Sequence, residues 1–217
     1  GLATIVAAYR RVLSITVDHS GATQELENLA VDWKLSIAEA LEANNLQFSE
    51  TRLSEANAVF PNDVDWANLN SDLLNRRSAE RIYENSVTLL SSQGFSDLPS
   101  ATAAIQSFHE VLRLAPGHPD AIMKLTELAV HYANLSSTAI AEGRLNDGIS
   151  LLERATAADR SIPQLDDVRK LISQATTARA AIDDLLREAR RLRSEQQLMS
   201  PAGENAAELY HRVLAID

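Results

Sequence analysis

Three segments of the chain share one pattern of residues. Residues 9–15 read Tyr-Arg-Arg-Val-Leu-Ser-Ile, residues 108–114 read Phe-His-Glu-Val-Leu-Arg-Leu, and residues 210–216 read Tyr-His-Arg-Val-Leu-Ala-Ile. Each segment begins with an aromatic residue, continues with two polar residues and Val-Leu, and ends in Leu or Ile. The segments stand 99 and 102 residues apart, and this spacing predicts an internal duplication of a unit of about 100 residues.

The duplication extends beyond these three segments. A shift of 99 residues aligns residues 22–60 with residues 121–159 without a gap, and three inserted residues after position 189 restore the register further on. Matched pairs that include aromatic residues and a proline are less expected by chance than matches of Ala and Leu alone. The matched pairs are Leu26/Leu125, Leu29/Leu128, Ala30/Ala129, Val31/Val130, Trp33/Tyr132, Leu46/Leu145, Leu53/Leu152, Ala56/Ala155 and Pro99/Pro201.

Apolar residues recur at helical spacing in four segments of each copy, and the prolines fall between the segments. We expect helices over 21–43, 46–59, 63–92 and 100–115, then over 119–142, 145–158, 164–197 and 203–216, with 2–15 as a further helix that ends a preceding unit. Residues expected to cap helices are Asn62, Ser100 and Asp120. The predicted fold is all-α, more than about three-quarters helical and without a sheet. We interpret it as an α-solenoid of antiparallel helix pairs, with two tandem four-helix units at 21–115 and 119–217.

Composition restricts the partners of this chain of 217 residues. The net charge is −10 with a pI near 5.0, so the surface repels phosphate backbones, and aromatic residues make up only 5%. We therefore expect no nucleic-acid binding. No apolar run approaches the roughly 18 residues that span a bilayer, so we expect no membrane insertion of this segment. The chain has no cysteine, which excludes disulfides and thiolate chemistry.

No pattern of residues points to catalysis, a cofactor or a metal. The five histidines do not form an HExxH motif, and the chain has no Gly-rich phosphate loop or nucleophile elbow. Adjacent carboxylates such as Asp183 and Asp184 point apart on a helix. The arginines of residues 187–193 alternate with acidic residues at helical spacing, which is typical of a solvated ion-pair face. Arg76 aligns with the apolar position Ala175, and we interpret it as a residue that extends its charge to solvent, with a partner contact as the alternative.

Two stretches resemble tetratricopeptide repeats. Ala104-x-x-x-Phe108 followed by Pro116 is similar to the second half of such a repeat, and residues 143–155 are similar to another second helix, with Gly148 at the small position. The helices at 21–43 and 63–92 depart from the family pattern in sequence and length. The resemblance implies a partner-binding inner surface on the first helices. Its candidate residues here are Gln24, Asn28, Val31, Asp32, Met123, Glu127, Val130 and His131.

The resemblance implies a non-catalytic scaffold that binds a protein or peptide. The alternative is a sensor or regulatory domain that binds a small ligand and controls an attached effector. Because the chain begins with Gly1, we expect a segment of a larger multidomain protein. We expect a bacterial origin, with cytoplasm and periplasm both open. Apolar residues of 2–15 and 203–216 should then lie uncovered, and we expect end-to-end self-association of this fragment.

Overall fold

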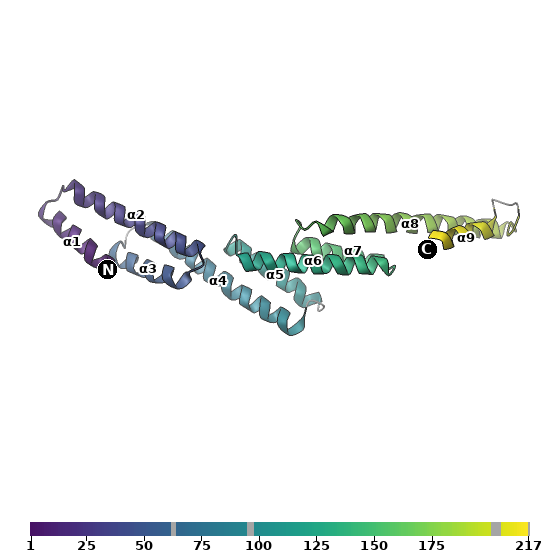
Figure 1. Cartoon of the computed structure of the whole chain (residues 1–217), viewed down its shortest axis with the longest axis horizontal. Helices are drawn as coiled ribbons and strands as arrows, with labels where there is room; N and C mark the ends of the chain where they lie inside the picture. Colours follow the sequence, from purple (N-terminus) through teal and green to yellow (C-terminus); the bar gives the residue numbers. More distant parts are fainter. Residues whose placement is uncertain (62–63, 95–97, 201–204, 217) are drawn as a thin grey trace. The chain divides into compact units, whose positions relative to one another are not determined.

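The structure, a computed structural model, describes residues 1–61, 64–94, 98–200 and 205–216. These residues contain nine α-helices and no β-strand, and 85% of them are helical. The helices, labelled in Figure 1, are α1 (Leu2–Ile15), α2 (Ser20–Glu42), α3 (Leu46–Val59), α4 (Val64–Gln93), α5 (Leu98–Leu114), α6 (Pro119–Ala141), α7 (Leu145–Ala158), α8 (Gln164–Ser194) and α9 (Ala206–Ile216). The predicted all-α class and helix content are confirmed.

Helix starts recur at the spacing found in the sequence. Helices α2 and α6 are both 23 residues long, and α3 and α7 are both 14 residues long. The starts of α2 and α6 lie 99 residues apart (20 to 119), as do those of α3 and α7 (46 to 145). The backbone hydrogen bonds that close α2 and α6 recur as well: Asn45 N donates to Ala40 O, and Arg144 N donates to Ala139 O, both at 2.8 Å.

Histidines cap the first helices of both pairs. His19 Nδ1 accepts a hydrogen bond from Ala22 N at 3.1 Å, and His118 Nδ1 accepts one from Ala121 N at 3.3 Å. The expected caps are wrong for two positions, because Ser100 lies inside α5 and Asp120 lies inside α6. The third, Asn62, is outside the described residues.

The chain divides into two compact units, Gly1–Ile122 and Met123–Asp217. The first contains α1 to α5 and the first turn of α6, and the second contains the rest of α6 with α7 to α9. The two superposable four-helix units at 21–115 and 119–217, and their arrangement as a solenoid, stay predictions.

Large apolar side chains from α2, α3 and α4 form the core of the first unit. Its fully or almost fully buried members are Ile37, Leu41, Leu53, Ala56, Trp66 and Leu73. The ring of Phe60 stacks on that of Trp66 with centroids 6.2 Å apart. Helix α1 adds Leu2 and Val6, which pack against Val59. Burial of one such side chain contributes about 1.5–3 kcal/mol, so this cluster holds four helices together.

Helix α5 packs along α4 through small and aromatic residues. Ala101, Ala104, Phe108 and Val111 have no exposed surface, and the Phe108 ring lies 5.8 Å from that of Tyr83 on α4. The alanines let the two backbones approach closely, and Phe108 fills the space that remains.

In the second unit, α6 and α7 meet at a glycine. Ser136 Oγ on α6 donates a hydrogen bond of 2.5 Å to Gly148 O on α7. A Cβ atom at position 148 would lie 2.6 Å from Ile140 Cγ1 and 3.3 Å from Ser136 O. The α6–α7 contact therefore requires a residue without a side chain at 148.

We predict that Gly148→Ala destabilises the protein. The added methyl group overpacks against Ile140, which costs about 1–3 kcal/mol, whereas the gain in helix propensity is only about 0.5–1 kcal/mol. Urea unfolding followed by circular dichroism should show a net loss of about 1–2 kcal/mol.

Ser150→Ala on the exposed face of α7 is the matched control, and it should change stability by less than about 0.5 kcal/mol. In the background of Ile140→Ala, the methyl at position 148 keeps only its contact of 3.3 Å with Ser136 O, so most of its cost should disappear. A cost of Gly148→Ala that is unchanged in that background would contradict the contact with Ile140.

Candidate functional site

The candidate partner-binding residues of the first copy lie on one helix. Gln24, Asn28, Val31 and Asp32 are all exposed on α2. Gln24 Nε2 donates to Asn28 Oδ1 at 3.1 Å, so these two amides lie together on the surface. Val31 is 53% exposed, and Leu35, one turn further on, is 56% exposed. The face is thus available to solvent and carries large apolar side chains.

The candidate residues of the second copy lie on α6 and differ in exposure. Met123 and Glu127 are exposed, and Glu127 forms an ion pair of 2.7 Å with Lys124. Val130 and His131 are half-buried, and the ring of His131 packs edge-on against that of the buried Tyr132, with 5.5 Å between centroids. The α2 residues belong to the first unit and these α6 residues belong to the second.

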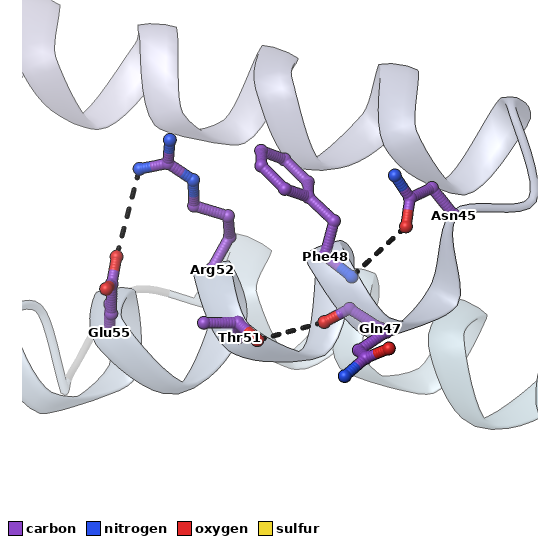
Figure 2. Close-up of a pocket in the computed structure, with 6 residues that line it drawn as sticks. All are labelled: Asn45, Gln47, Phe48, Thr51, Arg52 and Glu55. Carbon is purple, nitrogen blue, oxygen red and sulfur yellow. Dashed lines mark hydrogen bonds and ion pairs between the residues drawn. The ribbon is translucent and has the colours of Figure 1, made fainter.

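One surface cavity of about 510 Å³ lies along α3 (Figure 2). Figure 2 shows the side chains of Phe48 and Arg52 next to each other on one side of this helix. The Arg52 guanidinium lies 4.1 Å from the ring centroid of Trp33 and 5.0 Å from that of Phe48, and it is 3.8 Å from Glu55. The indole of Trp33 also donates to Arg52 O at 3.2 Å. These contacts hold Arg52 between two rings and explain how α2 and α3 keep their register.

A second cavity of about 510 Å³ lies between α1 and α3. Val6 and Val59 form its apolar part, and Arg10 and Arg11 lie at its rim. The Arg10 guanidinium donates to Val59 O, the last carbonyl group of α3. Arg10 thereby acts as a cap of that helix end, which is a structural role.

A third cavity, of about 310 Å³, gathers polar groups from separate parts of the first unit. We call it the Arg76 cavity. It is lined by Glu42 and Asn44 at the end of α2, by Arg76 on α4, and by Ala115, Pro116, Gly117, His118 and Pro119 in the turn from α5 to α6.

A histidine–carboxylate pair supports the Arg76 cavity. His118 Nε2 lies 3.1 Å from Glu80 Oε2, and the His118 side chain is only 5% exposed. Because His118 Nδ1 accepts from Ala121 N, the proton of the neutral ring is on Nε2 and is donated to Glu80. Asn44 Nδ2 reaches the same carboxylate oxygen at 3.5 Å. Glu80 thus ties the end of α2 and the start of α6 to α4.

Arg76 has a less complete set of partners than its burial suggests. Its side chain is 19% exposed, and its Nε lies 3.3 Å from Asp72 Oδ2. No other hydrogen bond or ion pair of Arg76 occurs within the described part of the chain. Its terminal amino groups are therefore available at the cavity wall.

Sequence reasoning missed the Arg76 cavity. It singled out Arg76 as unusual at an apolar position, but it did not connect Arg76 with His118. Helical periodicity could not bring Glu80 to His118 or Glu42 to Arg76, because it relates residues within one helix only. His118 and Glu80 lie 38 positions apart, and Glu42 and Arg76 lie on different helices.

The charged residues near the end of α8 form ion pairs with one another, as the alternation of arginines and acidic residues in the sequence indicated. Arg191 forms ion pairs with Glu188 and Glu195, and Arg187 forms one with Asp184. The hydrogen bond from Arg191 lowers the pKa of the Glu188 carboxyl, and the bonds to Glu188 and Glu195 raise the pKa of the Arg191 guanidinium. All five of these side chains are exposed, so these shifts mark a solvated face and not a reactive centre.

Within residues 1–61, 64–94, 98–200 and 205–216, no group of three or more His, Asp or Glu side chains has the arrangement of a metal site. None of the helices in those ranges is both long and apolar enough to cross a bilayer.

Comparisons with protein-family models, with curated proteins and with solved structures each find no match for this chain.

We predict that His118→Ala destabilises the first unit more than His19→Ala does. Both changes remove a helix cap, worth about 1 kcal/mol, but only His118→Ala also removes a hydrogen bond to a carboxylate, worth about 1.5–3 kcal/mol. Urea unfolding of the two variants measures the difference.

Glu80→Gln tests the same contact from the other side. It weakens the bond to His118, so the cost of Glu80→Gln should largely vanish in the His118→Ala background. Equal losses for the two histidine variants would show that the Glu80 contact does not contribute to stability.

Proposed function

We propose that this chain is a divergent tetratricopeptide-like segment that serves as a non-catalytic scaffold for protein–protein interaction. The observation that carries the proposal is the exposure of apolar side chains on the first helix of each pair. Val31 and Leu35 on α2 and Met123 on α6 are each more than half exposed. Tetratricopeptide arrays use the corresponding helices to bind peptides. The helix starts and the helix-closing hydrogen bonds that recur every 99 residues support a repeat architecture.

Charge on α2 supports a basic partner. The helix contains five acidic residues and one lysine, and Lys34 is already paired with Asp65. An exposed apolar stripe in an acidic surrounding is complementary to an amphipathic peptide that carries Lys or Arg beside its apolar residues.

We predict that peptides selected on the immobilised chain are apolar and basic, and that Met123→Ala, Glu127→Ala and His131→Ala together weaken their binding. Loss of the Met123 contact surface and of the Glu127 charge should cost about tenfold in affinity, or about 1.4 kcal/mol. Fluorescence anisotropy with the selected peptides is the measurement.

The paired variant Ser150→Ala and Glu153→Ala, exposed on α7, is the matched control and should bind like the wild type. Unchanged binding by the triple variant, with its helicity retained, would remove the α6 face from the proposed surface. Selection of acidic peptides would contradict the proposed partner chemistry.

A sensor or regulatory domain is the second candidate function, and the Arg76 cavity favours it. A ligand-binding domain needs a concave site with a few convergent polar groups, and this cavity brings Glu42, Asn44 and Arg76 together. In that role, binding of a small ligand would change how the chain acts on an attached effector.

Self-association of the chain is a further part of the proposal. Ile5 and Val12 on α1 are 46% and 37% exposed, and Leu214 on α9 is 72% exposed. The positions that match Ile5 and Val12 in α5 are Ala104 and Val111, which are fully buried. The comparison supports the view that the exposed face of α1 is suited to burial by another helix.

We predict that Leu214→Ser together with Val12→Ser reduces self-association. Each of the two apolar side chains contributes about 1.5–3 kcal/mol when it is fully buried, and serine removes that contribution. Light scattering over a concentration series should show a larger mass for the wild type than for the variant, and Ser150→Ala should behave like the wild type. Equal masses for wild type and variant at every concentration would contradict the role of these faces.

A further inference from the structure

We propose that the Arg76 cavity binds a free amino acid, a small zwitterion whose carboxylate contacts Arg76 and whose ammonium group contacts Glu42. The proposal does not depend on the scaffold function. It gives the second candidate function a class of ligand.

The size of the cavity fits a molecule of this kind. Its volume of about 310 Å³ lies at the lower end of the range for small-molecule sites. Its walls come from α2, α4 and the α5–α6 turn, so three separate parts of the first unit enclose it.

Opposite charges face this cavity without neutralising each other. Arg76 and Glu42 both line it, yet they form no ion pair with each other, and the ion pair of Arg76 is with Asp72 on its own helix. The Glu42 side chain is exposed and has no hydrogen bond or ion pair within the described part of the chain. A ligand with one positive and one negative group, placed between the two side chains, can form an ion pair with each.

The guanidinium of Arg76 supplies the recognition of a carboxylate. Its side chain is about four-fifths buried, and only its Nε is engaged. The two terminal amino groups form the fork that matches the two oxygens of a carboxylate. These amino groups are not fully buried, so they are accessible from the cavity, and a carboxylate can accept two charge-assisted hydrogen bonds from them.

The rest of the wall is held in place by contacts that a ligand does not have to make. Both ring nitrogens of His118 are occupied, one by Ala121 N and the other by Glu80. Asn44 has the left-handed backbone conformation, with φ 56°, that closes α2, and its side chain reaches Glu80. These contacts fix the turn and the end of α2, so the cavity is formed before a ligand arrives.

The second copy of the repeat lacks this chemistry. A shift of 99 residues places Ala141 on Glu42, Gly143 on Asn44, Ala175 on Arg76 and Arg179 on Glu80. The apolar core pairs are kept in the same alignment, whereas all four of these polar residues differ. The polar groups of the cavity are therefore not a requirement of the repeated fold, which supports a function specific to the first copy.

Two-dimensional amide NMR on the whole chain tests the proposal. The probes are glycine, L-alanine, L-serine and L-glutamine, each titrated to about 20 mM, with acetate and methylammonium as ligands that carry only one of the two charges. We expect at least one amino acid to shift the amide signals of Asn44 and Gly117, with a dissociation constant in the micromolar to millimolar range that such a small ligand allows. Acetate and methylammonium should produce no comparable shift.

Four variants assign the contacts. Arg76→Lys keeps the charge but loses the fork, and Glu42→Gln removes the negative charge, so each should weaken binding by about tenfold or more. Arg77→Lys and Glu39→Gln, at exposed neighbouring positions, are the matched controls and should leave affinity unchanged. The same spectra show whether each variant is folded.

Three results would overturn the proposal. The first is that none of the four amino acids shifts these signals. The second is that acetate binds as tightly as the amino acids and that Glu42→Gln has no effect, which would indicate a simple anion site. The third is that the control variants lose as much affinity as Arg76→Lys and Glu42→Gln, which would place the binding elsewhere. None of these results bears on peptide binding by α2 and α6, so the scaffold function is tested separately.

Discussion

The chain reverses direction within three residues after α2 and again after α6, and this reversal decides which side chains meet in each helix pair. The central residue of each turn has a positive φ, 56° at Asn44 and 77° at Gly143. Because the turn is so short, the first turn of the second helix lies directly against the last turns of the first. At the resulting contact, Gly148 approaches Ile140 and Ser136 too closely for any side chain. The matching residue of the first pair, Ser49, is small and fully buried.

The same turn also places a polar side chain at the Arg76 cavity in one copy and not in the other. Asparagine and glycine both tolerate a positive φ, so the backbone requirement is met equally by Asn44 and Gly143. Only Asn44 has a side chain, however, and that side chain reaches Glu80 on α4. The contact connects α4 to the end of α2, next to the α5–α6 turn. Asn44, whose place in the turn is set by backbone geometry, thus forms part of the wall of the Arg76 cavity.

Much of the fold could be predicted from the sequence because helix boundaries depend on local signals. The expected ranges 46–59 and 145–158 agree with α3 and α7, and 63–92 and 164–197 agree with α4 and α8 to within a few residues. The caps could not be predicted in the same way. Propensity favours Ser, Asp and Asn at a cap, whereas a histidine ring performs that role at His19 and His118. The candidate residues on α2 are exposed, whereas the Arg76 cavity depends on contacts between distant residues that no local pattern records.

Two arginines, Arg76 on α4 of the first copy and Arg191 on α8 of the second, show how the cavity differs from an ordinary charged surface. Arg191 on α8 is exposed and bonds to both Glu188 and Glu195, so its charge is neutralised within its own helix. Arg76 on α4 is about four-fifths buried, and only one of its nitrogens is engaged. Alanine occupies the matching position 175 in the second copy, so the repeated fold does not require an arginine there. The partial burial of Arg76 leaves its two terminal amino groups at the cavity wall without protein acceptors, and these groups can donate to an anionic group that enters. The first copy therefore has, at this position, hydrogen-bond donors that the second copy lacks.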